Sequence, residues 1–277
     1  MKPTKGLHNL ETLILEELKT GAKKVSRMIE AIQKLRPGTT KQGVYAMLRT
    51  LRSEEKIVAH GGFASLNNIW LQKMVTYFTI AQKNYTSSDT RDNGFLNLAD
   101  GEQVQYFFRD PIQTDTFWSH AYGILLSTMP PRKPVYLYNP HEWFLLAHRE
   151  NERAVMNTVV ASGRGFYLVA GNKTPLDVSL AKEFDGVQMR YAMADAPLFL
   201  KQNYYVNILG DYLIEAYLDP RTAEWIDAFF HSRTELTPEA QAEIEQIVRS
   251  RGRSRLVISR SAKKAKKLVA LLERSFQ

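Results

Sequence analysis

Apolar residues in the N-terminal part of the chain recur at spacings of three and four, the period of an amphipathic helix. The pattern predicts three helices, at residues 9–19, 24–35 and 40–52. Gly21 ends the first helix, and the break at Arg36-Pro37-Gly38 ends the second. A threonine hydroxyl at Thr39 or Thr40 is a suitable N-cap for the third helix.

A β-hairpin is predicted directly after the third helix. Short β-prone runs at residues 56–60 and 63–66 flank Gly61-Gly62, and paired glycines favour a tight turn. Three helices followed by a hairpin is the order of a winged helix-turn-helix, which usually places its third helix in the major groove of DNA. The side chains expected to face DNA are polar or basic: Thr40, Lys41, Gln42, Tyr45, Arg49 and Arg52 on the helix, with Lys56 and His60 in the wing.

The stretch QGVYAMLRTLRSEEKI, residues 42–57, resembles the recognition-helix region of PadR-like and related winged-helix regulators. The likeness covers about residues 8–72 and implies a winged-helix fold that binds double-stranded DNA. Glu54-Glu55-Lys56 replaces the Glu-Gly that usually leads into the wing of these regulators, so we expect a turn of different shape.

Beyond the wing, a helix is favoured at residues 66–80, where it either pairs with a second copy of the chain or packs on its own domain. Residues 85–94 have the composition of a linker. Short strands then alternate with helices, which indicates an α/β domain with a mixed sheet. The predicted strands are residues 104–108, 134–138, 143–146, 165–170, 187–191, 204–209 and 212–217, and the predicted helices are 116–129, 151–161, 175–184 and 220–231.

The stretch VNILGDYLIEAYLDPRTAEWIDAFF, residues 206–230, is similar to the end of the phospholipase-D-like α/β domain of TrmB-like regulators. This looser resemblance covers about residues 100–232. Active members of the phospholipase D superfamily need a His with a Lys two residues later, and no histidine of this chain has one. The resemblance therefore implies a regulatory or dimerisation domain without that chemistry.

Other catalytic and ligand motifs are missing from the sequence. There is no His-Glu-x-x-His, Gly-x-Ser-x-Gly, Walker or dinucleotide-binding motif, so we expect neither an enzyme nor a cofactor. His141-Glu142 and His148-Arg149-Glu150 could supply metal ligands, but the interpretation as polar turns is preferred and no metal is expected. The many aromatic residues of the middle region favour core packing over a small-molecule pocket.

Charge is segregated along the chain. Residues 1–75 carry 13 Lys+Arg against 6 Asp+Glu, residues 76–248 carry 14 against 22, and residues 249–277 carry 10 against 1. Two basic ends around an acidic middle suggest two surfaces that face a polyanion. The C-terminal end is predicted to form an amphipathic helix at residues 261–276, and its secondary phosphate contacts are expected from Arg251, Arg253, Arg255, Lys263, Lys264 and Lys267.

These patterns predict a winged-helix domain at 1–75, a connecting helix and linker at 76–98, an α/β domain at 99–248 and a basic C-terminal helix at 249–277. The predicted function is a sequence-specific transcriptional regulator that binds double-stranded DNA as a homodimer, and a response to a small-molecule effector is left open. Two alternatives stay open: a nucleic-acid-processing enzyme targeted by the winged helix, and an antitoxin-like autoregulator. The absence of cysteine, of a long apolar run and of a signal-peptide pattern predicts a cytoplasmic protein without a membrane partner.

Overall fold

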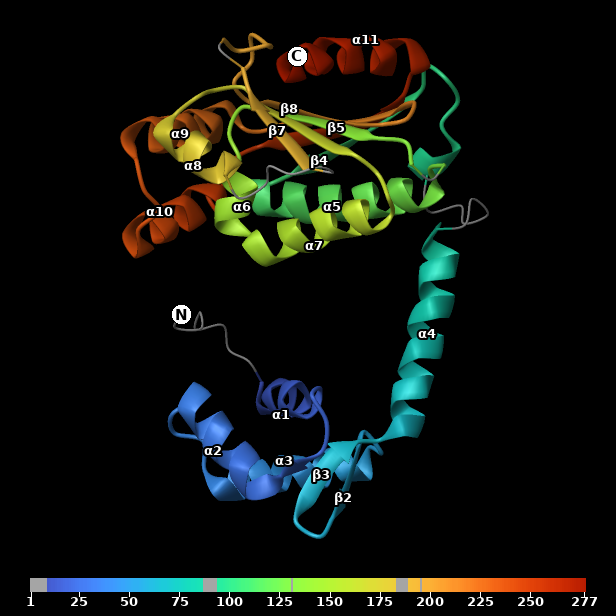
Figure 1. Ribbon diagram of the computed structural model, residues 1–277, viewed down its shortest axis with the longest axis vertical. Coiled ribbons are helices and arrows are strands. Elements are labelled where there is room, and N and C mark those ends of the chain that lie inside the picture. The colour runs from blue at the N-terminus through green and yellow to red at the C-terminus, as the bar shows by residue number, and fades with distance from the viewer. Residues whose placement is uncertain (1–8, 87–93, 131, 183–188, 195) are drawn as a thin grey trace. The chain divides into compact units, whose positions relative to one another are not determined.

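The computed structural model describes residues 9–86, 94–130, 132–182, 189–194 and 196–277. The chain divides into two compact units, Met1–Asn84 and Tyr85–Gln277 (Figure 1). The predicted linker at 85–94 falls largely outside the described residues. No helix in the described part of the chain is long and apolar enough to cross a membrane.

The first unit is a winged helix-turn-helix. Its elements are α1 (Leu10–Leu18), β1 (Lys23–Lys24), α2 (Val25–Leu35), α3 (Lys41–Ser53), β2 (Ile57–His60), β3 (Phe63–Leu66) and α4 (Asn68–Thr86). The strands form an antiparallel sheet in the order β1-β3-β2, of which β1 was not predicted. Ile14, Ile32, Val44 and Leu51 bring the apolar faces of the three helices into one core.

Local signals explain the boundaries of α3 and the wing. Asn9 caps α1, and the Thr40 hydroxyl accepts a hydrogen bond from the Gly43 backbone N at 3.0 Å, as an N-cap does. Gly61 and Gly62 have φ of 57° and 79°, the conformation that a two-residue hairpin turn needs at both positions. Glu55 also has a positive φ, 59°, in the turn that leads into the wing.

The second unit is a layered α/β domain. Its seven-stranded mixed sheet has the order β4-β10-β9-β8-β5-β6-β7, in which β5, β6 and β7 are parallel and the other neighbours are antiparallel. The strands are β4 (Gln103–Phe108), β5 (Val135–Asn139), β6 (Phe166–Ala170), β7 (Met189–Met193), β8 (Tyr204–Leu209), β9 (Tyr212–Tyr217) and β10 (Ser254–Arg260).

Helices cover both faces of this sheet (Figure 1). Helices α5 (Pro111–Thr128) and α7 (Arg149–Ala161) pack on one face through Trp118, Leu125 and Met156. Helix α11 (Ala262–Glu273) covers the other face, where Leu268 and Leu272 contact the strand tyrosines. A third cluster joins α6 (Trp143–Ala147), α8 (Pro175–Ala181), α9 (Pro220–Ser232) and α10 (Pro238–Val248). Two short 3-10 helices, Gly94–Asn97 and Arg274–Phe276, complete the unit.

The structure corrects the predicted elements at three places. Residues 143–146 were predicted as a strand, but they belong to helix α6. The helical turn directs Leu145 into the core beneath α5 and α7, and it directs Trp143 and Leu146 into the cluster with α8, α9 and α10. Helix α10 was not predicted. Strand β10 was not predicted either: the predicted basic C-terminal helix does form, but the residues before it pair with β4 and β9 inside the sheet.

Candidate nucleic-acid interface and buried polar cavity

Helix α3 presents a continuous polar and basic stripe to solvent. Lys41, Tyr45, Arg49 and Arg52 follow one another at helical spacings of four, four and three, so they share one face, and all are exposed. Gln42 flanks this stripe and is also exposed. The buried side chains of Val44, Leu48 and Leu51 lie on the adjoining face of the helix. Packing therefore fixes which side of α3 is offered to a partner.

The wing residues behave differently from one another. His60 ends β2 next to the glycine turn and is exposed, as are Val58 and Phe63 on the same hairpin. Lys56 lies at the base of the wing, where its Nζ is 2.6 Å from Glu11 Oε1 and 2.7 Å from Glu54 Oε2. These two hydrogen bonds raise the pKa of Lys56. Lys56 thus ties α1 to the end of α3 and offers no free charge to DNA.

Arg36 is a further candidate contact that was not predicted from the sequence. It lines an open concavity of about 310 Å³ with Pro37, Thr39 and Thr40, at the turn between α2 and α3. Arg36 is exposed, and this concavity opens beside the first turn of α3. Backbone N–H groups at a helix N-terminus favour anions, so the same end of α3 suits a phosphate. A cationic residue in the turn itself is the signal that could have identified it.

The predicted C-terminal phosphate contacts separate into two groups. Arg253 and Arg255 line an open groove of about 540 Å³ together with Lys201, Phe107 and Tyr217. The Arg253 guanidinium lies 4.7 Å from the Phe107 ring centre, and that of Arg255 lies 4.4 Å from the Tyr217 ring centre. These cation–π contacts hold both guanidinium groups in the groove, where their positive charge favours a polyanion.

The other predicted contacts lie outside this groove. Lys263 and Lys267 are exposed on the outer side of α11, and Arg251 is exposed in the loop before β10. Lys264 is engaged, because its Nζ lies 2.6 Å from the buried Glu215 Oε2. Lys264 therefore anchors α11 to strand β9.

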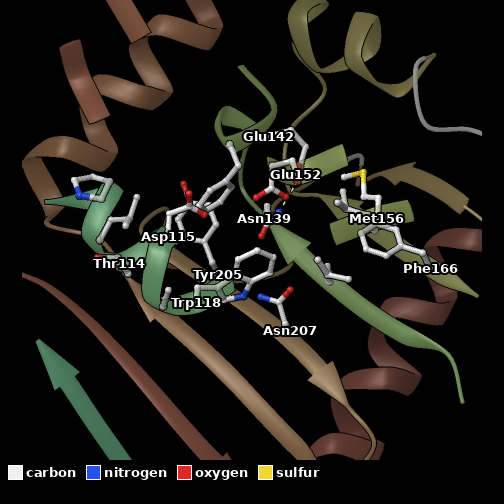
Figure 2. Close-up of a pocket in the computed structure, with 16 residues that line it drawn as sticks. Thr114, Asp115, Trp118, Asn139, Glu142, Glu152, Met156, Phe166, Tyr205 and Asn207 are labelled. Carbon is white, nitrogen blue, oxygen red and sulfur yellow. Dashed lines mark hydrogen bonds between the residues drawn. The ribbon is translucent and has the colours of Figure 1, made fainter. Parts of the chain in front are cut away.

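The second unit also contains a buried polar cavity between the sheet and helices α5, α6 and α7 (Figure 2). Three carboxyl groups surround it, from Asp115, Glu142 and Glu152, with the amides of Asn139 and Asn207. Asn139 donates to Glu142, and the Asp115 carboxylate lies 2.8 Å from His148 Nδ1. The cavity volume of about 20 Å³ holds roughly one water molecule, so this conformation does not accommodate an organic effector.

Burial controls the charge of this cavity. Burial raises the pKa of Glu142 to about 7, although the hydrogen bond from Asn139 acts in the opposite direction. Burial also holds the pKa of Glu152 well above its usual range, and the negative charges of Asp115 and Glu142 add to this effect. One oxygen each of Asp115, Glu152 and Asn207 has no hydrogen-bond partner among the described protein atoms. The cavity thus contains carboxyl groups of which two, Glu142 and Glu152, have pKa values raised by burial.

The similarity of this chain to known proteins is confined to distant structural likenesses. No family model and no curated protein matches the sequence. Among solved structures, TrmBL2, described as an archaeal chromatin protein with a novel mode of DNA binding, aligns over 99% of this chain and 93% of its own at 11% identity and a TM-score of 0.34. NucT from Helicobacter pylori aligns over 63% of this chain and 96% of its own at 12% identity and a TM-score of 0.35. Neither likeness places this chain in a family.

Proposed function

We propose that this protein is a transcriptional regulator that binds double-stranded DNA through α3 and the wing. The observation that carries the proposal is the exposed stripe of Lys41, Tyr45, Arg49 and Arg52 on a helix whose other face is packed into the core. Arginine pairs with guanine edges and glutamine with adenine, so Arg49, Arg52 and neighbouring Gln42 supply readout chemistry. Lys41 and Arg36 supply phosphate contacts near the start of the helix.

The test compares two double variants of the full chain. The double variant Arg49→Ala, Arg52→Ala is expected to bind genomic operator fragments at least about tenfold more weakly than the wild type at physiological ionic strength. The reason is that each arginine–guanine pair contributes about 1–3 kcal/mol. The fragments are those recovered with the wild-type protein and identified by sequencing. The matched control, Lys19→Ala with Lys133→Ala, removes the same charge from exposed positions outside α3, the wing and α4. Equal affinities of the two double variants would refute the assignment of α3.

We also infer that the regulator is a homodimer joined through α4. Ile69, Val75, Tyr77, Phe78 and Ile80 are each more than half exposed, and their positions run around the helix rather than along one stripe. A helix that is apolar all round is normally covered by protein. The variant Val75→Glu with Phe78→Glu should then sediment as a monomer under conditions in which the wild type is a dimer. A wild type that is monomeric at all concentrations tested would contradict this proposal.

A metal-dependent nuclease is the second candidate, favoured by the three carboxyl groups of the cavity. The closed cavity of about 20 Å³ excludes a phosphodiester, which is why DNA binding without cleavage is preferred. Incubation of the protein with labelled DNA and Mg²⁺ or Mn²⁺ separates the two functions. Cleavage that is abolished by Asp115→Asn would favour the nuclease.

A further inference from the structure

Three side chains outside the cavity converge beyond the end of strand β5, beside the C-terminal half of α9. His141, Asp227 and His231 each offer one ligand atom, and these atoms lie within 4.8 Å of one another. His141 follows β5 by two residues, while Asp227 and His231 occupy one face of α9 at a spacing of four. Because β5 and β6 are parallel neighbours, this is the edge of the sheet at which ligands of open α/β sheets bind.

The protonation of His141 can be deduced from its neighbours. Its Nδ1 lies 3.0 Å from Asp177 Oδ2, an oxygen that also accepts hydrogen bonds from the backbone N and the hydroxyl of Thr174. An oxygen that accepts from both Thr174 groups is an acceptor for His141 as well, so Nδ1 carries the proton. The His141 ring, which is only 1% exposed, stacks on Phe230 at 4.4 Å between ring centres and is held in this orientation.

The other nitrogen of His141 then bears a lone pair. Asn172 Nδ2 lies 3.3 Å from His141 Nε2 and donates to the Pro140 carbonyl, which fixes its NH₂ group on this side. Asp227 Oδ1 lies 3.2 Å from the same Nε2. A carboxylate oxygen and an imidazole lone pair are both acceptors, and they repel each other at this distance unless a proton or a metal ion lies between them.

His231 is oriented in the same way. Its Nδ1 lies 2.9 Å from the backbone oxygen of Asp227 and donates to it, so in the neutral ring the lone pair is on Nε2. The side chain is 58% exposed, so it has room to adjust, and Asp227 is 24% exposed beside it. In metal sites, ligating histidines usually donate their second ring N–H to a carboxylate or a backbone carbonyl, as His141 and His231 do here.

We propose that His141, Asp227 and His231 form a binding site for a first-row transition-metal dication, with Asp177 and the Asp227 carbonyl orienting the two imidazoles. Two imidazoles and one carboxylate suit Zn²⁺ and its neighbours rather than Mg²⁺ or Ca²⁺. The three ligands leave a fourth position open toward solvent on the side of His231. The bound ion would cross-link α9 to the end of β5, so metal binding stabilises the second unit.

The test titrates tag-free, chelator-treated full-length protein with Zn²⁺ by calorimetry and with Co²⁺ by visible absorption. We expect one strong Zn²⁺ site, a higher Tm in its presence and Co²⁺ bands that Zn²⁺ displaces. His231→Gln and Asp227→Asn should each weaken Zn²⁺ binding by at least about tenfold, and Asp177→Asn by about 10–100-fold, as loss of an orienting partner does. The control variant is His120→Gln, an exposed histidine on α5, which should leave binding unchanged.

Because His231 is exposed, its substitution leaves the fold intact, and circular dichroism checks this for every variant. The proposal is overturned if Zn²⁺ does not bind, or if it binds His231→Gln and Asp227→Asn as tightly as the wild type. Either result would mean that His141, Asp227 and His231 do not form a metal site.

Discussion

At the scale of single residues, substitution of Glu152 tests whether burial raises the pKa of a carboxyl group in the cavity. Burial raises its pKa well above the usual range, so the folded protein holds it protonated where the unfolded chain has already ionised it. A folded pKa above the unfolded one contributes stability that is fully present below the unfolded pKa and is lost as pH rises through the folded pKa. Each unit of pKa difference corresponds to about 1.4 kcal/mol.

We therefore expect the free energy of unfolding of the wild type to fall more steeply toward alkaline pH than that of Glu152→Gln, which cannot ionise. Urea unfolding at a mildly acidic and a mildly alkaline pH measures the difference. Glu150→Gln, an exposed neighbour on the same helix, is the control and should follow the wild type. Parallel pH profiles for the wild type and Glu152→Gln would show that Glu152 is already ionised in the folded state.

Residues with distant partners mark the limit of sequence reasoning at this scale. Lys56 was predicted to contact DNA because it lies in the wing. Its carboxylate partner Glu11 is 45 residues earlier in the chain, and packing of α1 brings the two side chains together. His141 is similar, since Asp177 and Asp227 approach it from two other helices. By contrast, the Thr40 cap depends on residues within one turn, and it was predictable.

At the scale of elements, the turn of the wing yields the next prediction. Gly61 and Gly62 both have positive φ, which β-branched side chains avoid. Gly61→Val should destabilise the first unit by about 1–3 kcal/mol and weaken DNA binding, because the hairpin no longer holds its register. Gly61→Asn should be tolerated, since Asn-Gly is the preferred pair in such turns. Thermal unfolding and DNA affinity of both variants measure the effect, and equal losses would contradict it.

Most helices and strands were predicted from their local patterns, whereas β10, α6 and α10 were not. The wing glycines and the helical period define the first unit well before any packing is considered. Strand β10 was missed because the arginines in and before it drew attention to charge, although its centre is the β-prone run Leu256-Val257-Ile258. The groove of Arg255 with Phe107 and Tyr217 follows from that strand, since all three share one cross-strand row. Helix α6 was mistaken for a strand because a short apolar run has no clear period.

At the scale of the whole molecule, the segregation of charge places two basic regions on different units. The stripe on α3 belongs to the first unit, and the groove and the outer lysines of α11 belong to the second. If both basic regions contact the same duplex, DNA affinity falls more steeply with salt concentration than it would if only the residues of α3 contacted phosphates. Each phosphate contact contributes about −0.9 to the slope of log affinity against log salt concentration.

Deletion of residues 249–277 cannot test this, because it would remove β10 from between β4 and β9 and expose the core beneath α11. Substitution keeps the fold: Lys263→Gln with Lys267→Gln removes two exposed charges, and Arg253→Gln with Arg255→Gln removes two from the groove. Each pair that contacts phosphates should make the slope shallower by about 1.8 while leaving the preference among DNA sequences unchanged. Lys264→Gln should instead lower stability, because it leaves the buried Glu215 carboxylate without its ion-pair partner. A slope that neither pair changes would confine DNA binding to the first unit, and the second unit would then act on DNA only through the geometry of the dimer.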